Sequence, residues 1–473
     1  MLTWAWPSTR NPFACTAGNP PLRSRTFAWH DPAGIRARAR GKSGLEFLRA
    51  MLAAGAHKAV VIGAGFIGLE TVEAFRHRGL DVTLVEMAPQ VLPAIDADMA
   101  SLVEAELRAH DVDVRTGIGF TAVEEGSASA GHPVDVVLAD GERIPADLVL
   151  LGVGVRPSTA LAREAGLELA ATGAVVVTPD QRTSDPRIWA VGDAIQVVDA
   201  VTGAPGVVPR AGAATGQGRI AADSIMGRDV ASSPVLGTAI VRVFGLTAAV
   251  TGPTSRRLGL AGVEHRQVNL HPGNHAGYYP GAQTLHLKVL FAPDGRLLGA
   301  QAVGHDGVDK RIDVLAVALR AGMDVDDLAE LELAYAPPFG SAKDPVNMAG
   351  FMAQNLLDGT LRTWSPTELD AVADGSALVL DVRSRREYAD GHVRGALNVP
   401  HIELRERLDE VRASAAGRPV RVLCASGFRS YLAHRVLVAA GFDSASLDGG
   451  MQSLLAARPH LVLEDRRTLA GAS

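Results

Sequence analysis

The stretch KAVVIGAGFIGLETVEAFRHRGLDVTLVE, residues 58–86, determines the fold that we expect for this chain. Residues 59–62 are an apolar run with the length and composition of a buried parallel strand. A helical pattern follows over 69–77, Gly79 ends it, and 81–85 has the composition of a second strand. This order of strand, glycine-rich turn, helix and strand predicts a Rossmann-type unit.

Gly63, Gly65 and Gly68 form the pattern G-x-G-x-x-G between the first strand and the helix. In this pattern the first glycine permits the tight turn, the second lets the backbone approach a pyrophosphate, and the third lets helix and strand pack closely. A glycine triplet alone also fits a tight loop that binds no ligand. Here, however, Glu86 follows the second strand, where an acid accepts hydrogen bonds from a ribose 2′-hydroxyl. We therefore expect a dinucleotide site that prefers NADH to NADPH, because no arginine directly follows Glu86.

The composition is that of an ordinary globular protein and excludes several classes. Of the 473 residues, 47% are hydrophobic and 21% charged, and the length suggests about three domains. A net charge of −6 gives no reason to expect nucleic acid, and no apolar run is long enough to span a membrane. Cys15 and Cys424 are the only cysteines, so we expect no disulfide framework, no metal site and a cytoplasmic location.

The first 58 residues differ from the rest, because they hold nine basic residues against two acidic ones. One interpretation is a basic interaction arm or a transit segment. The other is a poorly ordered or misassigned gene start. A short helix is expected over 45–52, leading into the first strand.

The alternating pattern of helix and strand continues to residue 155. The elements expected here are a helix over 98–110, strands over 112–114, 134–138 and 146–155, and a hairpin turn at Asp140-Gly141. The last strand closes with Gly152 and Gly154. This pair either lets another backbone approach the nicotinamide side of a site or serves only for packing, and spacing does not distinguish the two.

Four segments together resemble the pyridine nucleotide-disulfide oxidoreductases, a family of flavoproteins: VVIGAGFIGLE, VTLVE, ADLVLLGVGVRPSTALAREAGLEL and TSDPRIWAVGDA. The resemblance makes Gly192-Asp193 part of the second FAD motif, with Asp193 bonded to the ribityl chain, and includes Gly154 among the cofactor-binding positions. Phe66 and Glu70 match positions that line the contact between nicotinamide and flavin, although by spacing alone they are ordinary helix-start residues.

Residues 234–357 resemble the dimerisation domain of coenzyme A-disulfide reductases and related NADH oxidases. The matching segments include LGTAIVRVFGLTAAVTG, HAGYYPGAQTLHLKVLF and ELAYAPPFGSAKDPVNMAG. The resemblance implies a homodimer in which tyrosines of one subunit reach the active site of the other. The matching residues are Tyr278, Tyr279 and Tyr335. On spacing alone, stacked core aromatics remain an alternative.

The C-terminal hundred residues resemble a rhodanese domain, through DVR at 381–383, GHVRGALNVP at 391–400 and CASGFR at 424–429. Strands are expected over 377–383 and 420–423, and a helix opens at Ser430. Cys424 stands at a strand end before a loop whose N–H groups stabilise a thiolate, and Arg429 adds positive charge. We expect Cys424 to carry sulfane sulfur as a persulfide. The alternative is a buried structural cysteine.

The family resemblance begins only at about residue 59. Members of the family start with a first FAD domain that carries its own glycine triplet and a redox cysteine. Gly41, Gly44 and Gly55 make no such triplet, and Cys15 matches no motif of the family. We therefore expect the chain as written to be flavin-poor and prone to aggregation, with apolar strand surface exposed around 174–177 and 188–191.

The expected fold is α/β: a Rossmann-type NAD(P)-binding domain with a partial FAD domain, an α+β dimerisation domain and a C-terminal rhodanese domain. The expected boundaries are a basic segment 1–57, a nucleotide domain 58–155, the second FAD half 156–232, a dimerisation domain 233–358, a linker 359–366, a rhodanese domain 367–462 and a tail 463–473. The resemblance implies FAD- and NADH-dependent reduction of coenzyme A disulfide, persulfide or polysulfide, coupled to a rhodanese sulfur carrier. The alternatives are a sulfurtransferase on an incomplete nucleotide-binding dimer scaffold, and a truncated flavoprotein that only binds NADH.

Overall fold

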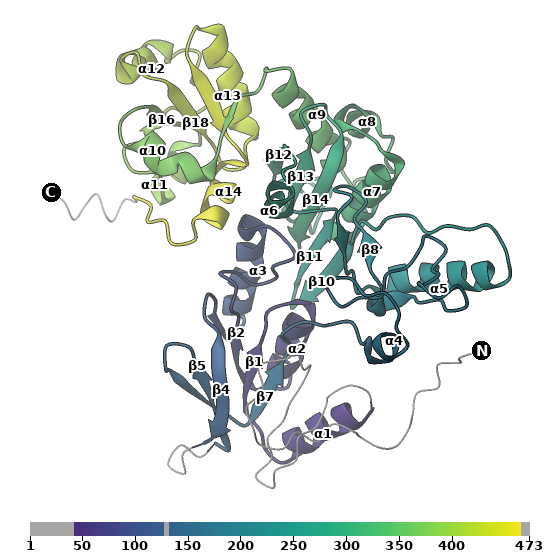
Figure 1. Cartoon of the computed structure of the whole chain (residues 1–473). Coiled ribbons are helices and arrows are strands. Elements are labelled where there is room, and N and C mark those ends of the chain that lie inside the picture. Colours follow the sequence, from purple (N-terminus) through teal and green to yellow (C-terminus); the bar gives the residue numbers. More distant parts are fainter. Residues whose placement is uncertain (1–41, 127–131, 465–473) are drawn as a thin grey trace.

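The computed structural model describes residues 42–126 and 132–464 (Figure 1). Most of the basic segment, with Cys15, and most of the tail therefore lie outside the described residues. The first described element, α1 (Lys42–Ala53), confirms the short helix predicted before the first strand. In the described part of the chain, no helix is long and apolar enough to cross a membrane.

The nucleotide unit, residues 58–155, is built on a parallel sheet with the strand order β3-β2-β1-β7. Its central strand β1 is buried at every position after the first, as expected of a strand covered on both faces. The elements of this unit are β1 (Lys58–Ile62), α2 (Phe66–Arg76), β2 (Asp81–Val85), α3 (Ala97–Ala109), β3 (Val112–Arg115), β4 (Phe120–Glu125), β5 (Val134–Leu138), β6 (Arg143–Ala146) and β7 (Leu148–Leu151).

Two predicted boundaries in this unit were wrong. Helix α2 begins at Phe66, three residues earlier than predicted, because Gly65 is extended and serves as its N-cap. The apolar run 146–155 is not one strand: Ala146 ends β6, and β7 begins at Leu148 and ends at Leu151. Between them the Asp147 carboxylate accepts backbone N–H bonds from the start of β1, which fixes the chain where it changes sheets.

Strands β4, β5 and β6 form a separate antiparallel sheet beside the parallel one. The predicted turn at Asp140-Gly141 is confirmed, since it joins β5 to β6 and Gly141 has a positive φ of 91°. Strand β4 was not predicted. Its residues are mostly half-buried or exposed, so its sequence lacks a clear apolar face.

The middle segment, residues 156–232, contains little regular structure apart from helices α4 (Ala160–Glu164) and α5 (Ala211–Ile225). The rest of the segment has a single 3-10 turn (Gly192–Ala194), the short strand pair β8 (Val197–Val198) and β9 (Pro205–Gly206), and isolated bridges. The prediction of bare strand surface was wrong for 174–177, because Ala174 and Val175 are buried in a small apolar cluster of this segment. Val191, in the other predicted stretch, is 37% exposed.

The antiparallel unit, residues 233–358, has a five-stranded sheet in the order β10-β11-β14-β13-β12 with helices against it. One buried cluster joins apolar residues of β10 and β11 to those of α2, α3 and the parallel sheet, so these two units share a core. Its elements are β10 (Ala239–Val243), β11 (Leu246–Thr251), α6 (Ser255–Leu260), β12 (Arg266–Leu270), β13 (Leu285–Phe291), β14 (Leu297–Gly304), α7 (Val308–Ala321), α8 (Val325–Glu330) and α9 (Pro345–Leu357).

The C-terminal unit, residues 359–464, is a second parallel sheet in the order β15-β19-β18-β16-β17. Part of the stretch predicted as a linker belongs to it, because β15 (Thr363–Trp364) pairs with β19 and Trp364 is buried. The remaining elements are a 3-10 turn (Pro366–Glu368), α10 (Leu369–Ala373), β16 (Leu378–Asp381), α11 (Arg385–Asp390), β17 (Leu397–Asn398), α12 (Leu408–Ala415), β18 (Val420–Leu423), α13 (Phe428–Ala439), β19 (Ser444–Leu447) and α14 (Gly450–Ala457).

Direct contacts hold the C-terminal unit against the other two. The Asn269 backbone N–H and side-chain amide donate to the two carboxylate oxygens of Asp448, at 3.0 and 2.6 Å. His271 Nε2 lies 2.8 Å from Ser453 Oγ, and helix α14 contacts α3 of the nucleotide unit (Figure 1). Asp448 and Ser453 are both buried at this contact.

Candidate functional site

The predicted glycine turn lies at the carboxyl end of β1, and two of its three glycines are required by close contacts within the protein. A Cβ on Gly68 would lie 1.9 Å from the Gly63 carbonyl oxygen, and a Cβ on Gly63 would lie 2.5 Å from the Gly152 carbonyl oxygen. A Cβ on Gly65 would meet no atom within 4 Å, so this position faces open space at the start of α2. The turn therefore offers a ligand room at Gly65, as a pyrophosphate requires.

Glu86 is fixed beside this turn by two backbone hydrogen bonds. The Ala64 N–H donates to Glu86 Oε2 at 2.7 Å, and the Ala88 N–H donates to Oε1 at 2.8 Å. Each carboxylate oxygen still has a lone pair for a ribose hydroxyl. The residues present thus fit an adenosine ribose next to the glycine turn.

We expect the wild-type chain to bind NADH more tightly than NADPH, because the 2′-phosphate of NADPH would face the Glu86 carboxylate. Each 1.4 kcal/mol of like-charge repulsion corresponds to about a tenfold difference in affinity. Glu86→Gln should weaken the binding of both nucleotides, because it disturbs the turn. It should also reduce the ratio of the affinity for NADH to the affinity for NADPH. Titration of both nucleotides by intrinsic fluorescence measures this, with Glu125→Gln on an exposed edge of β4 as the control. Equal wild-type affinities would contradict the prediction.

The two glycines after β7 have different surroundings. A Cβ on Gly152 would lie 3.5 Å from the Ile62 carbonyl oxygen and 3.7 Å from Gly68 Cα, so Gly152 packs against the turn. Gly154 has a φ of 94°, which favours glycine, and a Cβ there would meet nothing within 4 Å. Gly154 is therefore the member of the pair that leaves space for a ligand.

Arg210, which was not predicted, lies between two of the predicted cofactor residues. Its guanidinium carbon is 4.5 Å from the centre of the Phe66 ring. Burial lowers the pKa of Arg210, and the nearby Asp193 carboxylate acts in the opposite direction. Asp193 is exposed, and the Gly192 N–H donates to Gln217 Oε1 at 2.8 Å, which fixes the turn to α5. No motif in the sequence pointed to Arg210, because its neighbours come from distant segments.

Glu70, the other residue predicted at the nicotinamide contact, is exposed on the first turns of α2. Phe66 and Glu70 lie on the first turns of α2, directly after the glycine turn, and Asp193 lies in the 3-10 turn that begins at Gly192. Within the described residues, however, the only G-x-G-x-x-G is that of Gly63 to Gly68. The described residues thus fit the pyrophosphate and adenosine ribose of the nucleotide, and they supply a candidate residue for FAD only on its ribityl side.

The three tyrosines lie at the surface, which excludes the alternative of stacked core aromatics. Tyr278 is 78% exposed, Tyr279 41% and Tyr335 50%. A hydrogen bond joins Tyr278 to Tyr335 and raises the pKa of Tyr278, and the Tyr279 ring meets His275 edge-on. In the described part of the chain, the recorded contacts of these rings reach neither the glycine turn nor Cys424.

Cys424 lies at the end of β18 and is 1% exposed. The Gly427 N–H points at Sγ from 3.2 Å, and Sγ lies 3.3 Å from Ser430 Oγ. Both groups are at the start of α13, where unpaired N–H groups favour negative charge. A Cβ on Gly450 would lie 2.6 Å from the Cys424 carbonyl oxygen. The 449–450 turn can therefore pack against the Cys424 loop only because residue 450 is glycine.

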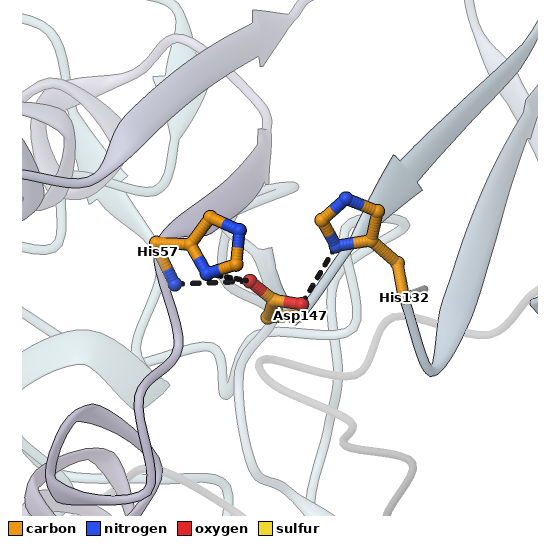
Figure 2. Close-up of side chains that lie close together, drawn as sticks. All are labelled: His57, His132 and Asp147. Atoms are coloured by element: carbon orange, nitrogen blue, oxygen red, sulfur yellow. Dashed lines mark hydrogen bonds and ion pairs between the residues drawn. The ribbon is translucent and has the colours of Figure 1, made fainter. Parts of the chain in front are cut away.

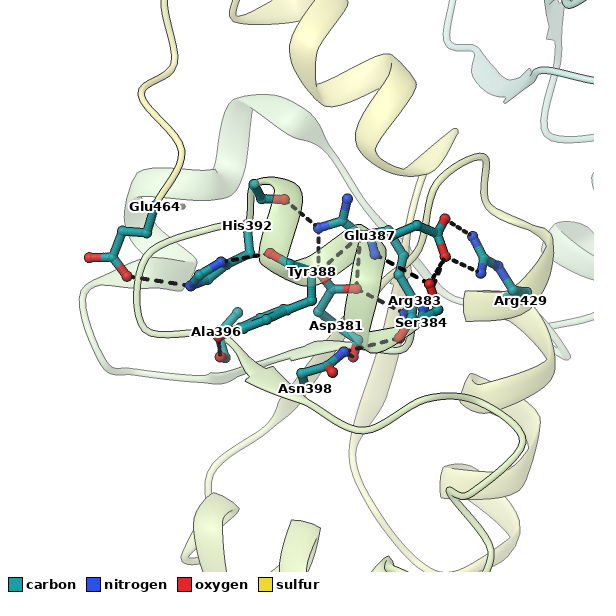
Figure 3. A network of polar contacts seen from close by, with 11 residues as sticks. Asp381, Arg383, Ser384, Glu387, Tyr388, His392, Ala396, Asn398, Arg429 and Glu464 are labelled. Atoms are coloured by element: carbon teal, nitrogen blue, oxygen red, sulfur yellow. Dashed lines mark hydrogen bonds and ion pairs between the residues drawn. The ribbon is translucent and has the colours of Figure 1, made fainter. Parts of the chain in front are cut away.

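Arg429 does not act on Cys424 as an isolated charge. Its guanidinium makes two hydrogen bonds to Glu387, at 2.8 and 2.6 Å (Figure 3). These bonds lower the pKa of Glu387 to about 2, although burial acts to raise it. Hydrogen bonds from Ser384 also lower this pKa. Glu387 therefore offsets part of the positive charge that the sequence assigned to the loop.

A network beneath Glu387 positions its helix (Figure 3). Arg383 pairs with Asp381 and donates to the Gly391 carbonyl, while the Tyr388 hydroxyl donates to the Ala396 carbonyl. The capping box between Ser384 and Glu387 starts α11. The pattern S-x-x-E at 384–387 could have predicted this helix start, but not the ion pair with Arg429.

We expect acid to weaken the C-terminal unit through Glu387. Its folded pKa of about 2 lies below the ordinary value of 4.5, so the stabilisation is present above pH 4.5 and is lost as the pH falls toward 2. Thermal unfolding between pH 6 and pH 3.5 should show a smaller acid destabilisation in Glu387→Gln than in wild type. The same pH dependence in both proteins would refute the assignment.

Comparisons with known proteins agree with this arrangement. Family models match as follows: pyridine nucleotide-disulphide oxidoreductase at 36–218, its dimerisation domain at 238–345 and a rhodanese-like domain at 365–457. The structure of reduced CoADR-RHD from Bacillus anthracis is 40% identical, with a TM-score of 0.86, over 90% of this chain and 75% of that one. An NAD-dependent persulfide reductase from A. fulgidus is also 40% identical, with a TM-score of 0.80, over 86% and 73% of the two chains.

Curated relatives match over a smaller share. A coenzyme A disulfide reductase from Staphylococcus haemolyticus is 36% identical over 64% of this chain and 67% of its own length. An NADH oxidase from Methanocaldococcus jannaschii is 35% identical over 62% of this chain and 65% of its own length. The chain thus spans about two thirds of the length of the curated relatives that it matches.

Proposed function

Because the chain belongs to the pyridine nucleotide-disulphide oxidoreductase family, we propose that it uses NADH to reduce a sulfur–sulfur bond. The substrate class is coenzyme A disulfide, a persulfide or a polysulfide, and the C-terminal unit carries the sulfur. The observation that carries this proposal is the arrangement at Cys424, where Sγ accepts a hydrogen bond from the Gly427 N–H and donates one to Ser430 Oγ.

The sulfur chemistry follows from those contacts. The Cys424 thiolate attacks the sulfane sulfur of a persulfide donor, forms a Cys–S–S⁻ group and releases the donor as a thiolate. The N–H of Gly427 and the start of α13 stabilise the negative charge before and after this transfer. A thiol acceptor then removes the sulfane sulfur and restores the Cys424 thiolate.

The nucleotide site supplies the reducing equivalents. Gly63, Gly65 and Gly68 would hold the pyrophosphate, Glu86 the ribose, and Phe66 with Glu70 the nicotinamide end. Asp193 would hold the ribityl side of FAD, which when bound passes electrons from the nicotinamide to sulfur. We further propose a homodimer, with Tyr279 and Tyr335 directed to the partner's site, and a cytoplasmic location.

A second candidate is a rhodanese sulfurtransferase on a nucleotide-binding dimer scaffold. The observation that favours it is the partial fit to FAD, since the described residues supply only the ribityl side of that site. The hydrogen-bond partners of Cys424 Sγ come from the loop and helix that directly follow it. Sulfur transfer at Cys424 therefore does not require a flavin.

Two measurements on the purified chain separate the candidates. The first is its flavin absorbance, and the second is NADH oxidation that depends on added coenzyme A disulfide or polysulfide. The reductase proposal expects a yellow protein that oxidises NADH only when a sulfur substrate is present, a result that would overturn the expectation of a flavin-poor chain. A colourless protein that transfers sulfane sulfur to a thiol but oxidises no NADH would instead establish the sulfurtransferase.

A further inference from the structure

Three side chains that are distant in the sequence meet at the amino end of the nucleotide unit (Figure 2). His57 directly precedes β1, His132 lies just before β5, and Asp147 joins β6 to β7. In Figure 2 the two imidazoles approach the carboxylate from opposite sides. None of the three residues takes part in the function proposed above.

The distances are those of a ligand cluster. His132 Nδ1 lies 2.8 Å from Asp147 Oδ1, and His57 Nδ1 lies 3.4 Å from Oδ2. One ligand atom from each residue can be chosen so that all three lie within 4.8 Å of one another. In a tetrahedral zinc site with bonds of about 2.0–2.1 Å, ligand atoms stand roughly 3.3 Å apart. An ion between the three groups would replace the present hydrogen bonds of His57 Nδ1 to the Gly55 carbonyl and of His132 Nδ1 to Asp147.

The carboxylate is already fixed as a ligand would be. The backbone N–H groups of His57 and Lys58 both donate to Asp147 Oδ2 at 2.9 Å, which leaves Oδ1 facing His132. The carboxylate therefore keeps its position while the two imidazoles adjust.

We propose that His57, His132 and Asp147 form a binding site for one zinc-class divalent cation, with solvent in the remaining coordination position. Two imidazoles and one carboxylate are the donors that such ions prefer, whereas magnesium and calcium prefer oxygen ligands alone. The open position follows from the exposure of His57, whose side chain is 69% exposed.

A bound ion would have a structural role and would take no part in hydride transfer. The cluster lies at the amino end of β1, and the glycine turn lies at its carboxyl end, five residues or roughly 16 Å away. A bound ion would tie the entry to β1, the entry to β5 and the β6–β7 junction to one point. Cation binding should therefore stabilise the nucleotide unit without changing its affinity for NADH.

The test is a titration of the metal-free full-length chain with Zn²⁺ against a chromogenic chelator, repeated with Co²⁺ as a spectroscopic probe. We expect one equivalent to bind, a visible cobalt spectrum typical of tetrahedral coordination, and a rise in the unfolding temperature of a few degrees at saturating Zn²⁺. His132→Gln and His57→Gln should each weaken binding at least about tenfold. The control His460→Gln, an exposed histidine of the C-terminal unit, should bind like wild type.

A fluorescence titration with NADH shows that the variants are folded, because the nucleotide site lies at the opposite end of β1. NADH affinity should be the same in wild type, His132→Gln and His57→Gln. The absence of stoichiometric binding to wild type would overturn the proposal. Binding that persists unchanged in both variants would also overturn it. The outcome does not depend on the reductase proposal, since neither readout uses turnover.

Discussion

Sulfur transfer to cyanide or a thiol falls to background when Cys424 is replaced by serine. Serine has almost the same shape, so it keeps the packing of this buried position, but its oxygen cannot carry sulfane sulfur. The measurement is turnover with thiosulfate or a persulfide donor. Ser430→Ala is expected to reduce turnover by roughly two- to tenfold, because it removes the oxygen that accepts from Cys424 Sγ and the hydroxyl that donates to the Gly427 carbonyl, and a neutral hydrogen bond contributes about 0.5–1.5 kcal/mol. Turnover retained in Cys424→Ser would show that the 424–429 loop is not the sulfur carrier.

The role of Arg429 can be separated from that of its partner Glu387. Arg429→Ala should weaken sulfur transfer, both by removing a positive charge near the sulfur and by leaving the Glu387 carboxylate unpaired. In the double variant with Glu387→Gln the second effect is absent. Partial recovery in the double variant is expected; no recovery would assign the whole effect to the charge of Arg429.

The second large effect is expected at the glycine turn, where two neighbouring substitutions should act differently. Gly68→Ala places a Cβ 1.9 Å from the Gly63 carbonyl oxygen, so the turn must open, NADH binding is lost and the unfolding temperature falls. Gly65→Ala meets no protein atom within 4 Å and should leave the unfolding temperature unchanged. Its methyl group would occupy space that the pyrophosphate needs, and should therefore lower the affinity for NADH at least about tenfold.

Nucleotide titration together with thermal unfolding separates the two outcomes. If Gly65→Ala bound NADH like wild type, the open space at this position would not be the pyrophosphate site. If Gly68→Ala were as stable as wild type, helix α2 would have moved away from β1.

The sequence predicted those parts of the molecule whose geometry is local. The glycine turn between β1 and α2 and the loop from Cys424 to Arg429 each depend on a few consecutive residues, and both were placed correctly. The strands that carry them were also predicted, because an apolar run of four or five residues is typical of a buried parallel strand.

Contacts between distant segments could not be predicted in the same way. No periodicity in the sequence connects the residues that meet in these contacts: Arg210 with Phe66, Glu387 with Arg429, and His57 and His132 with Asp147. The apolar run at 146–155 was misread for a related reason. Its division into two strands depends on Asp147, which accepts hydrogen bonds from a segment about ninety residues earlier in the chain.

The contact between Asn269 and Asp448 has a consequence for how sulfur travels. Asp448 immediately precedes the 449–450 turn that supports the Cys424 loop, and it is fixed to the antiparallel unit by two hydrogen bonds. These bonds hold the loop of Cys424 against the antiparallel unit in the structure. On the function proposed above, sulfur would therefore pass between Cys424 and the nucleotide site on a thiol small enough to diffuse between them.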